Sequence, residues 1–143
     1  LLDLSEQAGT DFAVCTAIDP ACGGGAFLAP VALRMWKRTT KPAAGDALQD
    51  IAARLRGIEL DPFAAWITQV LLEASLLPLC VKAGARFPQV ITVGDALQHD
   101  QMGKFSLVIG NPPYGRVKLT DAMRTKYARS LYGHANLYGL FTD

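Results

Sequence analysis

Short apolar runs alternate with longer segments of helical character along this chain of 143 residues. Four runs are predicted to be buried strands, because they are apolar and are bounded by turn-forming residues. Strands that alternate with helices are typical of an α/β fold with a parallel sheet. In such a sheet ligands bind beyond the carboxyl ends of the strands, so chemistry is expected directly after each strand. The predicted strands are Phe12–Asp19, Ile58–Leu60, Gln89–Val93 and Phe105–Ile109.

Capping residues predict where the helices begin and end. Asp61 is a typical N-cap and Pro62 a typical first helical residue, so a helix is expected from there towards Lys82. Pro78 is expected to kink or break that helix late. Asp46 is expected to cap a short helix that runs through Arg54. The other expected helices are Gly25–Lys37, Asp121–Leu131 and Ala135–Phe141, and Thr39–Gly45 is expected to be a loop.

Composition predicts one compact, soluble domain. Half of the residues are hydrophobic, and 14 Lys and Arg nearly balance 13 Asp and Glu. A strongly basic nucleic-acid surface is therefore missing from the average, although basic residues concentrate between Arg116 and Arg129. Composition alone favours a solvated helix face for that cluster. The three cysteines lack CxxC spacing, which favours a reducing compartment over disulfides or zinc.

No segment of the sequence is predicted to be a signal peptide or to span a membrane. The first residues do not resemble a signal peptide, because a basic flank and an apolar core are missing. The longest apolar stretch, Phe63–Val81, contains Gln69 and Glu73 and is too interrupted to span a bilayer. We therefore expect a cytoplasmic protein.

A glycine-rich segment follows the first predicted strand, in the order Asp19-Pro20-Ala21-Cys22-Gly23-Gly24-Gly25. Glycines before a helix let the backbone turn sharply and approach a ligand closely. The third glycine of the dinucleotide motif GxGxxG is replaced by Leu28, which disfavours a pyrophosphate ligand. The carboxylate of Asp19 favours a cationic amino acid or sulfonium instead. A tight turn without any ligand is the alternative.

Acidic residues follow the second and third predicted strands. Glu59 is placed to accept hydrogen bonds from ribose hydroxyls, and Leu60 to lie on a purine face. Asp61 is better explained as the helix cap. Asp95 is placed to accept from an adenine amino group, or else it binds its own backbone in a turn.

The fourth predicted strand leads into Asn111-Pro112-Pro113-Tyr114. Two consecutive prolines cannot join a sheet, so the chain leaves it as a stiff extended loop. The Asn111 side chain and the Pro112 carbonyl then offer two neutral acceptors for a planar amine, whose ring can stack on Tyr114. A simple Pro-Pro turn is the alternative.

Taken together, these segments resemble the adenine-N6 DNA methyltransferases of the gamma class. Four segments resemble motifs I to IV of that family in order and spacing, namely Asp19–Leu28, Gly57–Pro62, Gly94–Leu97 and Asn111–Gly115. Ala135–Phe141 resembles motif V, and Leu1–Glu6 the end of the motif X helix. The resemblance implies a Rossmann-like methyltransferase fold whose N-terminal half has the strand order 3-2-1-4. Residues 1–143 would then be a partial catalytic domain without a target-recognition domain.

The resemblance also implies a cofactor, S-adenosyl-L-methionine, and residue roles. Asp19 and the glycines would hold the methionine portion, Glu59 the ribose, and Leu60, Asp95 and Phe141 the adenine. Asn111 and the Pro112 carbonyl would hold the target amine, and Tyr114 would stack on the flipped base. Gly24, in the middle of the glycine run, departs from the serine or similar residue that is usual in the family. The implied cofactor residues are Asp19, Ala21, Cys22, Gly23, Gly25, Phe27, Glu59, Leu60, Asp95, Ala96, Asn111 and Phe141, and the implied catalytic residues are Asn111, Pro112, Pro113 and Tyr114.

The implied partner is double-stranded DNA in a longer parent protein of bacteria or archaea. That parent would be a type II restriction–modification methylase, either free or joined to a restriction-endonuclease domain or partner. Other readings stay open. An RNA methyltransferase that acts on a guanine or adenine amine can carry similar loops, and a protein-glutamine methyltransferase is a third enzyme class. A module that binds the cofactor without catalysis is the non-enzymatic alternative.

Overall fold

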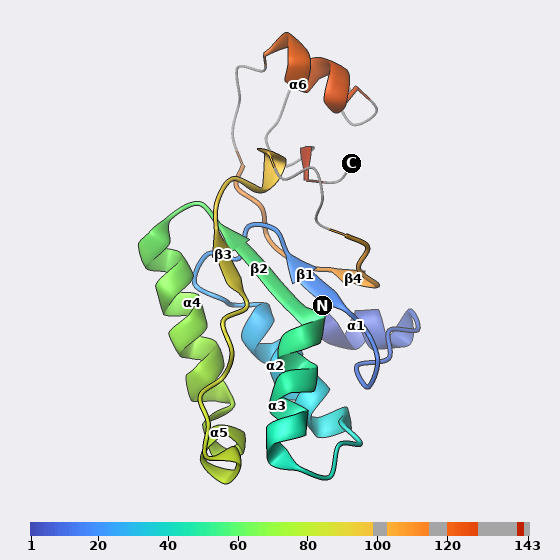
Figure 1. Ribbon diagram of the computed structural model, residues 1–143. Helices are drawn as coiled ribbons and strands as arrows, with labels where there is room; N and C mark the ends of the chain where they lie inside the picture. The colour runs from blue at the N-terminus through green and yellow to red at the C-terminus, as the bar shows by residue number, and fades with distance from the viewer. Residues whose placement is uncertain (99–102, 115–119, 129–139, 142–143) are drawn as a thin grey trace.

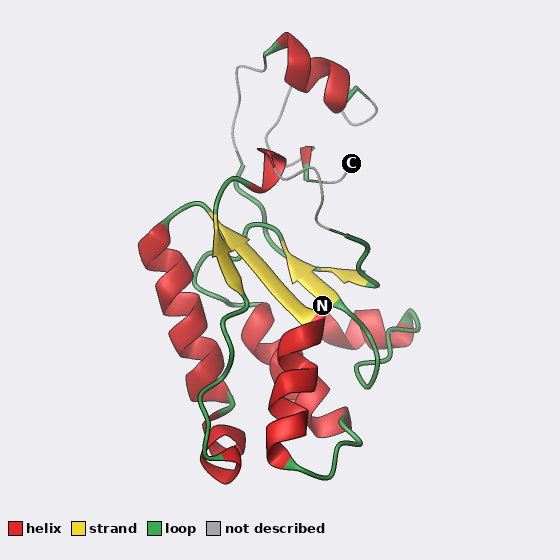
Figure 2. Ribbon diagram, viewed as in Figure 1, coloured by secondary structure: helices red, strands yellow, loops and turns green. Residues whose placement is uncertain are grey.

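The computed structural model describes residues 1–98, 103–114, 120–128 and 140–141 (Figure 2). Its elements alternate between strands and helices as the sequence predicts. In chain order they are α1 (Leu2–Gln7), β1 (Ala17–Asp19), α2 (Leu28–Arg38), α3 (Ala44–Arg54), β2 (Leu55–Glu59), α4 (Pro62–Ser75), α5 (Leu77–Ala83), β3 (Ile91–Val93), the 3-10 helix η1 (Ala96–Gln98), β4 (Leu107–Val108) and α6 (Asp121–Lys126).

The four strands form one parallel sheet in the order β3-β2-β1-β4. This arrangement confirms the predicted α/β, Rossmann-like methyltransferase fold and its strand order. The chain proceeds from β1 to β2 and β3 on one side, and β4 then pairs on the other side of β1. The direction of winding therefore reverses between β1 and β4, and ligands of open α/β sheets bind at such a switch point.

Helices α2, α3 and α4 gather on one side of the sheet, and α6 lies apart from them, beyond the ends of the strands (Figure 1). The main core lies between the sheet and the helices α2, α3 and α4. Its fully buried members include Leu28 and Met35 of α2, Ile51 of α3 and Leu72 of α4. A smaller cluster of Ile18, Ile58 and Ala96 forms separately, with Phe105 and Phe141 packed against it.

Helix α4 begins as predicted, because the Asp61 side chain accepts a hydrogen bond from the Phe63 N–H at 2.8 Å and Pro62 stands at the first turn. The predicted late break is also confirmed: Leu76 ends α4, and Pro78 stands in the first turn of α5. No single helix of the described residues is long and apolar enough to cross a membrane. By length and composition alone the pair α4 and α5, bent by 70°, passes the same test.

Several predicted boundaries are wrong. The strand expected over Phe12–Asp19 is reduced to Ala17–Asp19, because its first half forms a turn. In that turn the backbone N–H groups of Val14 and Cys15 both donate to the Asp11 carbonyl. Arg54 stabilises the turn by donating to the Phe12 and Cys15 carbonyls at 3.3 and 3.0 Å.

Helix boundaries differ for equally local reasons. Helix α2 starts at Leu28 rather than Gly25, because Gly23 and Gly25 have positive φ angles of 50° and 81°. Asp46 does not cap α3, which begins at Ala44 without a side-chain cap, and instead lies in the first turn. Strand β2 extends back to Leu55 and ends at Glu59. Strands β3 and β4 are shorter than predicted, at Ile91–Val93 and Leu107–Val108.

The last two predicted helices lie partly outside the described residues. Helix α6 ends at Lys126, and the predicted continuation to Leu131 includes positions that the structure does not describe. Of the predicted helix Ala135–Phe141, only Leu140 and Phe141 are described, and Leu140 is buried.

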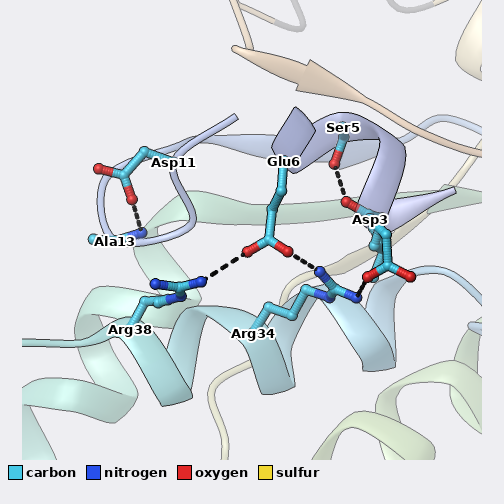
Figure 3. Close-up of polar contacts among 8 residues, drawn as sticks. Asp3, Ser5, Glu6, Asp11, Ala13, Arg34 and Arg38 are labelled. Carbon is cyan, nitrogen blue, oxygen red and sulfur yellow. Dashed lines mark hydrogen bonds and ion pairs between the residues drawn. The ribbon is translucent and has the colours of Figure 1, made fainter. Parts of the chain in front are cut away.

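Ion pairs attach α1 to the outer face of α2 (Figure 3). The guanidinium of Arg34 binds the carboxylates of Asp3 and Glu6, and Arg38 binds the other oxygen of Glu6 at 3.2 Å. Arg34 also stacks over the Phe12 ring at 5.7 Å. These contacts hold the N-terminal helix against α2.

Candidate functional site

A cavity of about 500 Å³ opens beyond the carboxyl ends of β1 and β2. Its volume is within the range that small-molecule sites usually have. It is lined by the segments that follow all four strands, together with α6 and Phe141. The lining residues are Pro20, Ala21, Gly23, Glu59, Leu60, Gly94, Asp95, Ala96, Leu97, Asn111, Pro113, Met123 and Phe141.

The glycine loop, residues Cys22–Gly25, is held by the chain around it. The Gly23 N–H donates to the Glu59 carboxylate at 2.7 Å, and the Gly23 carbonyl accepts from the Thr68 hydroxyl. The Gly25 N–H closes a turn by donating to the Cys22 carbonyl at 2.8 Å. The loop is therefore fixed by β2 and α4 as well as by its own turn.

Glu59 connects two of the loops that line the cavity. One carboxylate oxygen accepts from Gly23, and the other accepts from the Asp61 N–H at 2.9 Å. Each oxygen can accept further hydrogen bonds, so these contacts leave capacity for hydroxyl donors in the cavity. The neighbouring Leu60 is 71 % exposed and presents an apolar surface to the same space.

Asp19 lies behind the cavity wall. Its side chain is only 1 % exposed, and it accepts a hydrogen bond from the Ala21 N–H at 3.1 Å. A Cβ added to Gly110 would stand 2.5 Å from the Asp19 Oδ1, so the β4 end approaches this carboxylate as closely as only glycine allows. Asp19 thus contacts both the residue before the glycine loop and the segment that leads to Asn111.

Burial raises the pKa of the Asp19 carboxyl to about 6, against 3.8 for the ordinary group, and the nearby charge of Glu59 acts in the same direction. The folded state therefore binds a proton more tightly than the unfolded state. The free energy of unfolding should fall as pH rises from about 4 to about 6, by up to about 3 kcal/mol for this group alone.

Asp19→Asn is expected to remove this pH dependence of the free energy of unfolding without changing the shape of the side chain. Urea unfolding of the variant and the wild-type chain from pH 4 to pH 8 checks it, because the other carboxyls titrate alike in both. The variant should gain relative stability as pH rises through that window. A constant difference at every pH would contradict the raised pKa.

The segment after β3 lines the cavity as a turn that Asp95 stabilises. Its carboxylate accepts from the Leu97 N–H at 3.0 Å and from the Gln98 side chain at 2.9 Å, so the predicted turn contact is present. The Leu97 carbonyl accepts from the Tyr127 hydroxyl at 2.7 Å and from Lys126 at 3.0 Å. These contacts attach the end of α6 to the turn.

The loop after β4 places Asn111 and Pro113 on the cavity and Tyr114 beside it. The Tyr114 ring is 75 % exposed, and its hydroxyl donates to the Asn111 Oδ1 at 3.0 Å. Asn111 Oδ1, the acceptor expected for a target amine, is thus oriented by its hydrogen bond with Tyr114. Pro112 between them is half-buried, and Gly115 lies outside the described residues.

Nine of the predicted site residues line the cavity, and the others stand behind or beside it. Cys22, the first residue of the glycine loop, is buried, and burial raises the pKa of its thiol to about 12, which keeps it neutral. Gly25 and Phe27 lie on the way into α2. The nine are Ala21, Gly23, Glu59, Leu60, Asp95, Ala96, Asn111, Pro113 and Phe141.

Sequence reasoning missed the residues whose roles depend on tertiary contacts. Met123 reaches the cavity from α6, and Thr68 and Gly110 support it from within the fold. A threonine in an apolar helix stretch and a glycine just before Asn-Pro-Pro-Tyr are the available signals. Neither identifies its partner. Pro20, Gly94 and Leu97 were inside the predicted motifs but were not assigned to the site.

Comparison with known proteins gives this arrangement a family. Residues 53–143, which include Glu59, Asp95 and the Asn111–Tyr114 loop, match the family described as Eco57I restriction-modification methylase. The chain belongs to this restriction-modification methylase family. It is also 31 % identical over 137 residues to the Type II methyltransferase M.PaeR7I of Pseudomonas aeruginosa.

Solved structures of restriction-modification enzymes share the fold. The chain is similar to a nuclease-deletion mutant of the Type ISP enzyme LlaGI in complex with a DNA substrate mimic, with a TM-score of 0.67 and 16 % identity over 98 % of this chain. It is similar to the ATP-dependent Type ISP enzyme LlaBIII bound to DNA, with a TM-score of 0.66 and 16 % identity over 97 % of this chain. It is also similar to the DrdV–DNA complex, with a TM-score of 0.61 and 19 % identity over 98 % of this chain.

The chain is short beside these methylase relatives. It covers 23 % of M.PaeR7I and 15 %, 12 % and 17 % of the LlaGI, LlaBIII and DrdV chains. The matched region is thus one part of each of those proteins.

Proposed function

We propose that this chain is the cofactor-binding and catalytic part of an S-adenosyl-L-methionine-dependent methyltransferase that modifies the N6 amine of adenine in double-stranded DNA. The observation that carries the proposal is one cavity, which Glu59, Asp95 and Asn111 all line. Such a cavity can hold a nucleoside-containing methyl donor and still open towards an acceptor amine.

The residues fit the proposed cofactor. The Glu59 carboxylate suits the two hydroxyls of a ribose, and Leu60 and Phe141 supply apolar surface for a purine. The small residues Ala21 and Gly23 form part of the adjoining wall and leave room for a ligand. When bound, S-adenosyl-L-methionine supplies a sulfonium methyl group as the electrophile.

The chain's own contribution to transfer is to hold the amine. The lone pair of an aromatic amine is delocalised into the ring and attacks poorly. Acceptors at Asn111 Oδ1 and the Pro112 carbonyl favour a pyramidal nitrogen and stabilise the positive charge that develops on it. A carbonyl oxygen can accept two hydrogen bonds, so Asn111 can bind an amine N–H while Tyr114 directs it. The surplus proton then leaves to water.

Tyr114 is proposed to stack on the flipped base. Its exposure provides the face that stacking needs, and its hydroxyl bond to Asn111 sets the angle of the ring. The basic residues Arg124 and Lys126 of α6 are candidates for contacts with phosphates. Reading of a DNA sequence is proposed to be the task of another part of the parent protein.

DNA is favoured over RNA as the substrate by family membership and by the DNA complexes of the similar structures. Transfer of a labelled methyl group from S-adenosyl-L-methionine to duplex DNA tests the proposal, with RNA of matching sequence as the comparison. Incorporation into RNA alone would favour the alternative methyltransferase, and binding of the cofactor without any transfer would favour the non-catalytic module.

A further inference from the structure

Thr68 is a buried polar residue that the proposed mechanism does not use. It lies in the middle of α4 and is 0 % exposed, among buried positions such as Ala65 and Leu72. Burial of a hydroxyl group is unfavourable unless it is hydrogen-bonded. The partner of this hydroxyl is the carbonyl of Gly23, 45 residues earlier in the chain.

Both branches of the Thr68 side chain support the glycine loop. The hydroxyl donates to the Gly23 carbonyl, and a Cβ added to Gly25 would stand 2.9 Å from the Thr68 methyl carbon. The methyl therefore packs directly beneath Gly25. Threonine is the residue that offers a donor and a methyl from one Cβ, whereas serine, valine and alanine each lose at least one of them.

Gly23 is consequently held at both of its peptide groups. Its N–H donates to Glu59 and its carbonyl accepts from Thr68, so side chains from β2 and α4 fix it from two directions. Gly23 and Gly25 both have positive φ angles, and unsupported glycines exchange readily among many backbone conformations. The contacts select one of these conformations before any ligand binds.

We propose that Thr68 is a positioning residue, which pre-organises the glycine loop for the methyl donor. The inference rests on the proposed function, because it assumes that the loop borders the cofactor. A pre-organised loop spares the ligand the entropy of ordering it, so the role concerns binding rather than the transfer step. The hydroxyl should therefore affect the dissociation constant of the cofactor and leave kcat at saturating cofactor nearly unchanged.

Calorimetric titration of the full-length protein with S-adenosyl-L-methionine tests this role. Thr68→Val keeps the methyl and the volume but removes the donor, and it should raise the dissociation constant by about tenfold or more. Thr68→Ser keeps the donor and should stay within about threefold of the wild-type value. If valine prevents folding, Thr68→Ala against Thr68→Ser makes the same comparison of the hydroxyl group.

Gln69 provides a matched control on the same helix. It is also buried, but it holds the segment before β3 by donating to the Pro88 carbonyl at 2.9 Å and accepting from the Val90 N–H at 3.2 Å. Gln69→Met should lower the melting temperature without a matching loss of cofactor affinity. Thr68→Val should lose far more cofactor affinity than Gln69→Met for the same fall in melting temperature.

Wild-type affinity in Thr68→Val would overturn the role of Thr68, as would an equal loss in the serine and valine variants or in Gln69→Met. Failure of the wild-type protein itself to bind S-adenosyl-L-methionine would instead contradict the proposed function. The two failures are therefore distinguishable in one set of titrations.

Discussion

Asn111→Ala is expected to abolish methyl transfer and to leave cofactor affinity nearly intact. Asn111 lies on the exposed rim of the cavity, so its truncation should create no void in the core and should cost little stability. Loss of an acceptor that acts on charge developing in the transition state should lower turnover by at least about 10²-fold. Single-turnover transfer and calorimetric binding measure the two quantities separately.

Tyr114→Phe is the matched control for this variant. It removes the hydroxyl that donates to Asn111 Oδ1 but keeps the ring for stacking. If Asn111 binds the target amine directly, the phenylalanine variant should retain far more turnover than Asn111→Ala. Normal turnover in Asn111→Ala would remove Asn111 from the amine-binding role.

Glu59→Ala is expected to weaken cofactor binding by about 1.5–3 kcal/mol, the usual range for a lost charge-assisted hydrogen bond. Two effects should add. The proposed contact with ribose hydroxyls disappears, and the N–H groups of Gly23 and Asp61 lose their shared acceptor. Calorimetry with S-adenosyl-L-methionine measures the change.

Glu59→Gln helps to apportion that loss. The amide keeps one acceptor oxygen and the length of the side chain, so it can serve one of the two backbone donors but not both. We expect an intermediate affinity. Unchanged affinity in Glu59→Ala would exclude Glu59 from the cofactor site, whatever its structural contacts.

The gathering of the candidate site could be predicted because parallel topology decides it. Once four strands are placed in one parallel sheet, the residues after each strand must meet at the same edge, and Glu59, Asp95 and Asn111 do line one cavity. The helix cap at Asp61 and the break near Pro78 were predictable for a similar reason, since both depend on local backbone chemistry.

Features that depend on long-range contacts could not be predicted from the sequence. Phe12–Thr16 is apolar like a strand, yet Asp11 and Arg54 stabilise a turn there. Thr68 differs from other buried helix residues only through its partner on another element, and Gly110 only through its approach to Asp19. The spacing of hydrophobic residues along the chain gives no information about such pairs.

Identification of the methylated nucleoside is the most direct measurement of the proposed function. The full-length protein is incubated with labelled S-adenosyl-L-methionine and mixed-sequence duplex DNA, and the DNA is then digested to nucleosides and separated. The proposal predicts that the label appears in N6-methyl-2′-deoxyadenosine and that the Asn111→Ala variant produces no such labelled nucleoside. Label in methylated cytosine, label only in RNA of matching sequence, or no transfer by a protein that binds the cofactor would contradict it.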